Sequence, residues 1–150
     1  MSPSRLLLPV ALVALVACGG DDAKAEYVEQ ATAICTDAKT QLDAEQRPAT
    51  PDGFAPYVQR VVEIGEEASA ELLALDPPED DREELQARLL EPLVTQVQAG
   101  RDYAAKVEAA GNDTAQLLPL LSQVPDTGDI DLEYAADYGL STCTELLPQP

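Results

Sequence analysis

Apolar residues recur every three or four positions over most of the chain, which is the spacing of one face of an α-helix. A first stripe runs from about residue 25 to 45 and comprises Tyr27, Ala31, Ile34, Cys35, Ala38 and Leu42. A second stripe comprises Phe54, Tyr57, Val58, Val61, Gly65, Ala68, Leu72 and Leu75. Both predict amphipathic helices. The second helix starts either at Pro51, with Thr50 as its cap, or at Pro56.

Prolines mark the limits of the next helices. Asp76-Pro77-Pro78 is expected to end the second helix, because a residue before proline is pushed out of helical geometry. The longest stripe then runs from Glu79 to Ala110 and comprises Leu85, Leu89, Leu93, Val97, Gly100, Tyr103 or Ala104, and Val107. Pro92 lies inside it and predicts either a kink or two helices that meet there. Asp113 followed by Gln116 resembles a capping box for the next helix.

The C-terminal part of the chain predicts an interrupted helix. Thr114 to Val124 has a helical pattern but contains Pro119, and a turn and a short helix from about Asp131 to Tyr138 follow. An alternating β-strand pattern of useful length does not occur in the sequence. The sequence therefore predicts an all-α domain over residues 25–147: an up-and-down four-helix bundle with an interrupted last helix, followed by a tail over 148–150.

The first eighteen residues have the layout of a secretory signal peptide. Arg5 supplies a positive charge, and Leu6 to Ala17 is an almost unbroken apolar run. A membrane span needs roughly twenty apolar residues, so this run favours a signal peptide over residues 1–17 rather than a retained anchor. The run ends in Leu15-Val16-Ala17-Cys18, which resembles the lipobox of bacterial lipoproteins.

That resemblance implies a lipid on Cys18. In bacterial lipoproteins the cysteine receives a diacylglyceryl thioether and the chain is cut before it. Residues 18–24 would then be a lipidated cysteine and a flexible tether, and two or three acyl chains would hold the protein stably to the outer face of the cell membrane. The alternative is an ordinary secreted protein that is cut nearby and retains Cys18 as a thiol.

If Cys18 carries lipid, Cys35 and Cys143 remain in an exported, oxidising setting. Pairing them is the simplest interpretation, and two free thiols or an intermolecular bond are the alternatives. The helical stripe turns Cys35 inward, where a disulfide bond would be covered. Such a bond would join the first helix to the C-terminal end of the domain.

Several of these features together resemble small actinobacterial helical lipoproteins of no agreed activity. The resemblance rests on the lipobox, Tyr27-Val28-Glu29-Gln30-Ala31 with Ile34-Cys35, the Pro77-Pro78 hinge, and Tyr138-Gly139-Leu140 with Cys143. It covers most of the chain after the signal peptide and implies a bundle locked by a disulfide bond between the first helix and the C-terminus. Pro92, Pro119 and Pro125 depart from a regular bundle.

Charge and composition exclude several classes of function. The chain has 28 acidic and nine basic residues, so it should repel nucleic-acid phosphates, and nucleic acid is not an expected partner. It contains no histidine, the commonest metal ligand and the usual general base at neutral pH. We therefore expect neither an enzyme nor a bound cofactor.

Two sets of acidic residues remain candidates for chemistry. Asp126, Asp129, Asp131 and Glu133 could surround calcium, but their spacing does not match an EF-hand, and a turn followed by acids at a helix N-terminus explains them more simply. Glu66, Glu67 and Glu71, with the run from Glu79 to Glu84, could pair carboxylates for acid–base catalysis. Their inward neighbours are aliphatic, and solvated helix surface is the preferred interpretation, so no metal site is predicted.

The aromatic residues provide the last candidate site. A cavity among Tyr57, Leu93, Tyr103 and Tyr138 could hold a small hydrophobic ligand or lipid between the helices. The same tyrosines could be core residues whose hydroxyls reach the surface. The sequence thus predicts a non-catalytic module that binds another envelope protein, with a carrier of a hydrophobic ligand as the alternative.

Overall fold

The computed structural model describes residues 20–147, and over this range the chain is helical and contains no strand. The predicted signal peptide over 1–17, the lipidation site Cys18 and the tail over 148–150 lie outside the described residues. The helices are α1 (Gly20–Ala44), a short 3₁₀ turn (Pro51–Gly53), α2 (Phe54–Ala74), α3 (Arg82–Leu85), a π turn (Gln86–Leu90), α4 (Glu91–Ala110), α5 (Thr114–Leu121), α6 (Leu132–Tyr138) and α7 (Ser141–Thr144).

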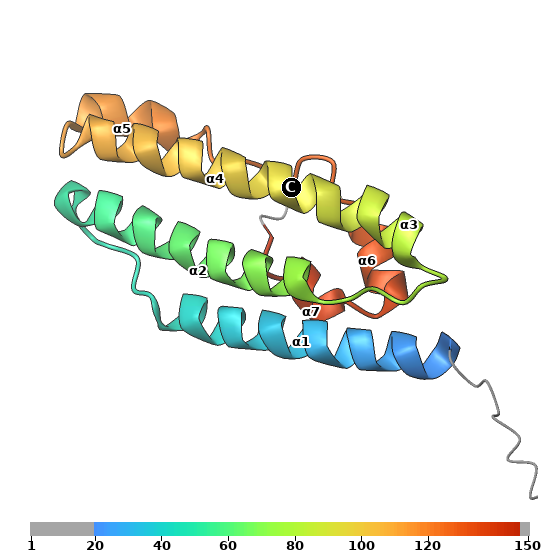
Figure 1. Cartoon of the computed structure of the whole chain (residues 1–150). Coiled ribbons are helices and arrows are strands. Elements are labelled where there is room, and N and C mark those ends of the chain that lie inside the picture. Colours follow the sequence, from blue (N-terminus) through green and yellow to red (C-terminus); the bar gives the residue numbers. More distant parts are fainter. Residues whose placement is uncertain (1–19, 148–150) are drawn as a thin grey trace, which may run out of the picture.

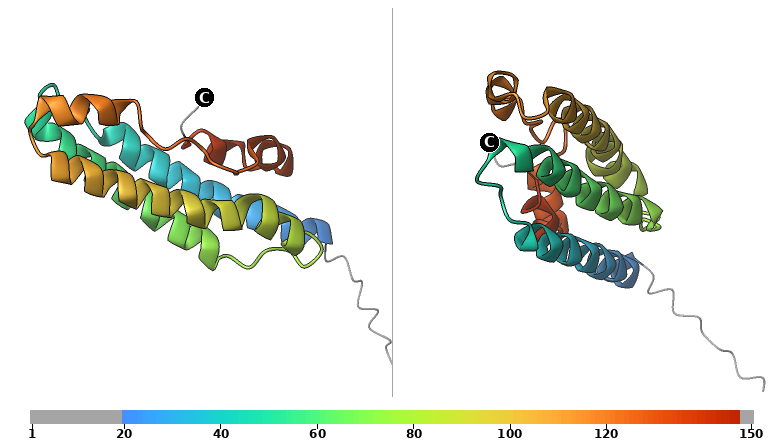
Figure 2. Two further views of the ribbon diagram at one scale, coloured as in Figure 1. Left: turned by 90° about the horizontal axis from the view of Figure 1, so that it is seen from above. Right: turned by 90° about the vertical axis from the view of Figure 1, so that its left-hand side faces the viewer.

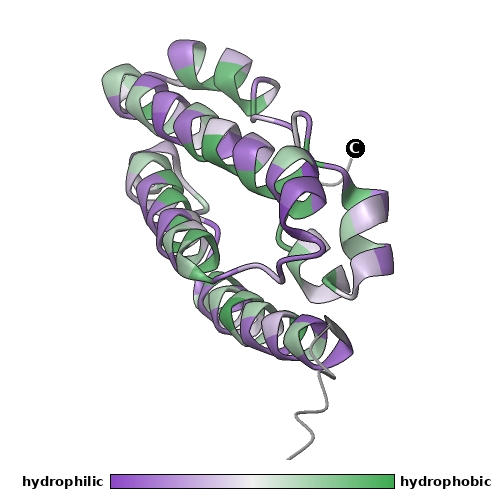
Figure 3. Ribbon diagram, turned by 45° about the vertical axis from the view of Figure 1, so that its right-hand side comes forward, coloured by the Kyte–Doolittle hydropathy of each residue, from purple (hydrophilic) through white to green (hydrophobic). Residues whose placement is uncertain are grey.

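Three long helices run side by side, and α2 lies between α1 and α4 (Figure 1). The C-terminal segment lies along one side of this layer in two pieces (Figure 2). Helix α5 packs against α4 at one end, and α7 packs against α1 nearer the other end. Each long helix carries hydrophobic and hydrophilic bands, as expected for helices with a buried face (Figure 3).

Helix limits follow the local sequence. Helix α1 starts at Gly20, so the part of the predicted tether from residue 20 onward is helical. Asp21 and Asp22 lie in its first turn, where acidic side chains interact favourably with the helix dipole. Pro51 begins the 3₁₀ turn that leads into α2, although Thr50 makes no side-chain capping bond.

A π turn accommodates Pro92 inside a continuous helix. Helical backbone runs without a break from Arg82 to Ala110, so the helix does not split at the proline. A π turn places one extra residue in the helix and rotates the preceding residues by about 100° relative to those that follow. This rotation explains why the adjacent residues Leu89 and Leu90 are both buried.

Arg88 and Asp131 join this helix to the start of α6. Pro92 has no N–H group to donate to the carbonyl oxygen of Arg88, and the N–H of Asp131 donates to that oxygen instead at 3.1 Å. The Arg88 guanidinium donates two hydrogen bonds to Oδ2 of Asp131, at 3.1 and 2.7 Å. Oδ1 of Asp131 accepts from the N–H of Tyr134 and caps α6. The acid is thus a helix cap with a cationic partner.

The contacts of Asp131 predict a pH dependence of stability. The Tyr134 N–H and then the Arg88 guanidinium lower the pKa of this carboxyl below its ordinary value. The stabilisation of the fold by the ionised Asp131 carboxyl is therefore present above the unfolded-state pKa, about 3.9. It is lost as the pH falls through the folded-state pKa. The slope of the unfolding free energy against pH reports the number of protons taken up on unfolding. We expect Asp131→Asn, which keeps a capping oxygen, to take up about one proton fewer at most below about pH 4, and so to have a smaller slope.

Urea unfolding at a series of pH values between 7 and 2 measures this slope. Asp129→Asn, on the same loop, is the matched control, and it should leave the slope as in the wild type. Equal slopes for all three proteins would show that the Asp131 carboxylate does not contribute to acid stability.

The Cys35–Cys143 disulfide bond is present and confirms the predicted pairing. It joins α1 to α7 across 108 residues of sequence, with the two Cα atoms 5.1 Å apart. The side chain of Cys35 is fully buried, as its place on the predicted stripe indicated. The bond holds the C-terminal segment against the first helix.

The predicted cap at Asp113 is confirmed. Oδ1 of Asp113 accepts from the N–H of Ala115 at 2.9 Å and caps α5. Gln116 closes the box differently from the prediction, because its amide donates to the Asp113 side chain rather than contacting its backbone. Gly139 has a φ of +112° and ends α6, where glycine is favoured.

Candidate functional site

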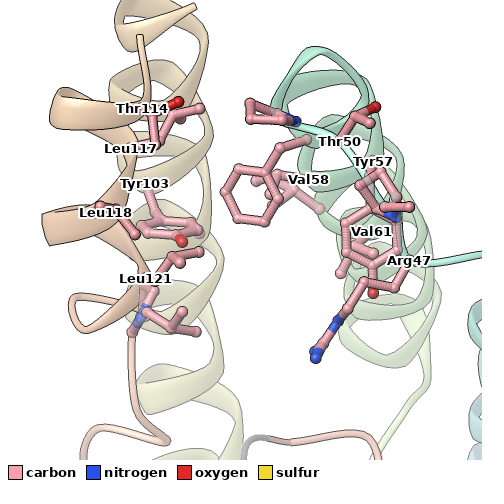
Figure 4. Close-up of a pocket in the computed structure, with 18 of the residues that line it drawn as sticks. Arg47, Thr50, Tyr57, Val58, Val61, Tyr103, Thr114, Leu117, Leu118 and Leu121 are labelled. Carbon is pink, nitrogen blue, oxygen red and sulfur yellow. The ribbon is translucent and has the colours of Figure 1, made fainter. Parts of the chain in front are cut away.

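A large cavity lies between α2 on one side and α4 and α5 on the other (Figure 4). Its volume is about 780 Å³, within the range of small-molecule sites. We call it the α2–α5 groove, and its lining residues are Arg47, Pro48, Ala49, Thr50, Pro51, Phe54, Tyr57, Val58, Val61, Val62, Gln96, Gly100, Tyr103, Thr114, Leu117, Leu118, Leu121, Val124, Pro125, Leu146 and Leu147.

Facing walls of the groove carry two of the three tyrosines predicted to line a ligand site. Tyr57 projects from α2, and Tyr103 projects from α4 on the opposite wall (Figure 4). The hydroxyl of Tyr103 donates to the carbonyl oxygen of Leu120 at 3.3 Å and ties α4 to α5. Burial raises the pKa of this phenol above its ordinary value, which further favours the protonated donor. Tyr57 is half-buried, and its hydroxyl forms no hydrogen bond with the described residues.

Carboxylates are missing from the wall of the groove. The lining contains no aspartate or glutamate, although the chain has 28 acidic residues. Arg47 is its charged residue, and Thr50, Gln96 and Thr114 add neutral polar groups. The groove is therefore a largely apolar, non-acidic surface on a strongly acidic protein.

The rim of the groove exposes large apolar side chains. Leu118, Leu121 and Val124 are 61%, 51% and 52% exposed. Leu118 and Leu121 project from α5, opposite the wall formed by α2 (Figure 4). A concave apolar surface that continues onto an exposed apolar rim is typical of a binding site rather than of a closed core.

A second, smaller cavity of about 190 Å³ lies between α1, α2 and the helix that contains Pro92. Cys35 and Cys143 line it, together with Leu93 and Gly65. Val61, Leu146 and Leu147 line both cavities and so form a shared wall. The disulfide bond at Cys143 fixes α7, which ends two residues before Leu146.

The four residues predicted to share one ligand cavity do not all meet. Tyr57 and Tyr103 line the α2–α5 groove, whereas Leu93 lines the smaller cavity. Tyr138 lies in another cluster, where its ring packs edge-on against Tyr27 with centroids 6.3 Å apart. Its hydroxyl donates to Asp81 at 2.6 Å, and burial followed by this carboxylate raises the pKa of Tyr138 well above its usual value.

Some of the acidic side chains considered for catalysis or calcium binding have structural contacts. Glu66 accepts from Arg101 at 2.7 Å, and Glu84 accepts from Arg88 at 3.0 Å. Asp126 accepts from the N–H of Gly128 and stabilises its own turn. Within residues 20–147, no three Asp, Glu or Cys side chains are grouped so that they could hold a metal ion.

In this same range, no helix has both the length and the apolar content needed to span a membrane. Comparison with protein-family models, curated proteins and solved structures finds no match to this chain. The function must therefore be argued from the geometry of the groove and the chemistry of its lining.

The sequence predictions missed most of this site. Phe54 and Val58 were assigned to a core stripe, and the residues that follow Thr114 were assigned to the last bundle helix. The signal that could have identified the groove is the run Leu117-Leu118 and Leu120-Leu121 on a helix of eight residues. So many leucines cannot all face one core, and some of them must remain exposed.

Proposed function

We propose that this chain is a non-catalytic binding module that carries a small hydrophobic ligand in the α2–α5 groove. The observation that supports the proposal is the groove itself: about 780 Å³, apolar, without acidic lining, and open along a leucine-rich rim. In architectural terms, α5 together with α6 and α7 takes the place of the fourth bundle helix. The interruption between these pieces leaves the groove beside α5.

The proposal places the module outside the cytoplasmic membrane, anchored by lipid on Cys18. The lipobox-like sequence supports the anchor, and the Cys35–Cys143 bond supports an oxidising compartment. Helix α1 has 25 residues and is roughly 37 Å long at 1.5 Å per residue. Because the groove lies near the C-terminal end of α1, it would be distant from the anchored end (Figure 1).

A second candidate function is docking of another envelope protein on the same rim. The exposed side chains of Leu118, Leu121 and Val124 favour it. The carrier proposal is preferred because the apolar surface continues inward to a cavity of ligand size, and a protein partner does not require such depth.

Filling part of the groove should weaken ligand binding. Gly100 lines the groove on α4, and a Cβ added there would lie 3.8 Å from Val62, at ordinary contact distance. A methionine at this position can adapt to the free space because its side chain is unbranched and flexible. We expect Gly100→Met to weaken the binding of a neutral apolar dye about tenfold or more, which titration by fluorescence measures. Intact-mass measurement under gentle conditions, on protein extracted from membranes, should also show that the variant has lost any ligand that co-purifies with the wild type.

Gly65→Met is the matched control, since Gly65 is also a glycine within a long helix but lines only the smaller cavity. It should bind the dye as the wild type does. The same mass measurement reports lipid on Cys18. Wild-type protein that binds no dye, or a Gly100→Met variant that binds it unchanged, would contradict the carrier proposal.

A further inference from the structure

We propose that the ligand of the α2–α5 groove is a single-chain amphiphile with an anionic head group that pairs with Arg47. This inference rests on the proposed function, because it names the ligand class of the same groove. It is carried by the contrast between Arg47 and the other arginines, and by the distribution of charge around the cavity.

Arginines elsewhere in the described chain have acidic partners. Arg60 pairs with Glu45 and Glu63, and an ion pair is also formed by each of Arg82, Arg88 and Arg101. Within residues 20–147, Arg47 alone among the arginines forms no ion pair. On a chain with 28 acidic and nine basic residues, an arginine without an acidic partner is unexpected, and this one lines the groove.

The position of Arg47 suits a head group at the open side of the groove. Its side chain lies along the wall that carries Tyr57 and Val61, and its guanidinium extends toward the space between the two walls (Figure 4). A guanidinium can donate two parallel hydrogen bonds to a carboxylate or a phosphate. The nearby Tyr57 hydroxyl, which has no hydrogen-bond partner among the described residues, offers another donor on the same wall.

Beyond this polar wall, the groove offers aliphatic and aromatic surface for a hydrocarbon chain. Val58 from α2 faces Leu117 and Leu118 from α5 (Figure 4). Phe54 adds an aromatic side chain to the same lining. The acidic exterior disfavours anions in general, but charges farther away than about 8 Å are largely screened at physiological ionic strength. Because the lining itself has no carboxylate, a bound head group would meet attraction from Arg47 and no acidic side chain on the wall of the groove.

Competition between two probes of matched chain tests the proposal. Oleate and oleyl alcohol have the same hydrocarbon chain but differ in charge, and each is titrated below its aggregation concentration against a neutral dye bound to the full extracytoplasmic chain. We expect the wild type to bind oleate about tenfold more tightly than the alcohol, a typical ratio for a charge-assisted hydrogen bond. Arg47→Gln should remove this preference and leave the affinity for the alcohol unchanged.

Arg60→Gln is the matched control. It removes the same charge as Arg47→Gln, but Arg60 does not line the groove. It should retain the preference for oleate. Equal binding of the two probes by the wild type, or equal loss in both variants, would overturn the pairing with Arg47 while dye binding still supports the carrier function. Failure of the dye and both probes to bind would overturn both proposals and favour a protein partner on the rim.

Discussion

Removing the disulfide bond by the double substitution Cys35→Ala and Cys143→Ala is expected to lower the free energy of unfolding by about 4 to 5 kcal/mol. The bond spans 108 residues, so in the chain-entropy model it restricts the unfolded chain strongly. Many domains of this size have a total stability of about 5 to 15 kcal/mol. The variant should therefore unfold at a much lower urea concentration, which circular dichroism at increasing urea measures.

Wild-type protein treated with a reducing agent is the control for this prediction, and Cys18→Ser in every sample prevents thiol exchange. Reduction removes the same covalent link without changing the side-chain carbon atoms, so its midpoint should approach that of the double variant. A loss smaller than about 1 kcal/mol in both samples would show that packing of α7 against α1 holds the C-terminal segment without the bond.

The disulfide bond connects stability to the candidate site. Cys143 belongs to α7, and the chain continues directly to Leu146 and Leu147, which separate the groove from the smaller cavity. Leu146 also packs against a buried cluster formed by Ala38, Ile64 and Ala68. The bond therefore positions one wall of the groove as well as stabilising the fold.

Local signals in the sequence were sufficient to predict the helices. The stripe of Tyr27, Ala31, Cys35 and Ala38 is buried in α1, because a helix at the side of the layer has a single face on the core. The pairing of Cys35 with Cys143 followed from counting cysteines in an exported chain. The helical stripe depends on residues that are close in sequence, and the pairing depends on the number of cysteines. Neither prediction requires knowledge of the tertiary packing.

Packing on two sides of one helix could not be predicted in this way. Helix α2 contacts α1 with Ile64 and Ala68, and it contacts α4 with Val58 and Val62. Analysis of a single stripe selected the residues around Val58 and omitted Ile64, which is 1% exposed. The position of α2 between two helices depends on the arrangement of the whole domain, and it cannot be predicted from the hydrophobic periodicity of α2 alone.

Departures from regular α-helical backbone also place residues away from their predicted neighbours. The π turn before Pro92 rotates the first part of the long helix, so Leu90 enters the core although the regular stripe omitted it. The candidate site was affected more strongly. Tyr57 and Tyr103 both line the groove, but Tyr138 belongs to α6, whose position is set by Asp131 and Gly139 rather than by helical spacing.

The buried position of Ile64 leads to the second large effect. Ile64→Ala is expected to lower the free energy of unfolding by about 3 kcal/mol, within the range of about 2 to 5 kcal/mol for such substitutions in a core. The loss combines the transfer of apolar surface with the cavity left between α1 and α2. Chemical denaturation of the purified variant measures it.

Leu73→Ala on the same helix is the matched control, because Leu73 is 40% exposed and its substitution also removes an aliphatic side chain. It should cost less than about 1 kcal/mol, since Leu73 is 40% exposed and loses less packing than the fully buried Ile64. Because Ile64 faces α1 and does not line the groove, Ile64→Ala should retain dye binding below its unfolding midpoint. Equal losses for the two variants would show that α2 is not buried between α1 and α4, and the walls of the groove would then have to be reassigned.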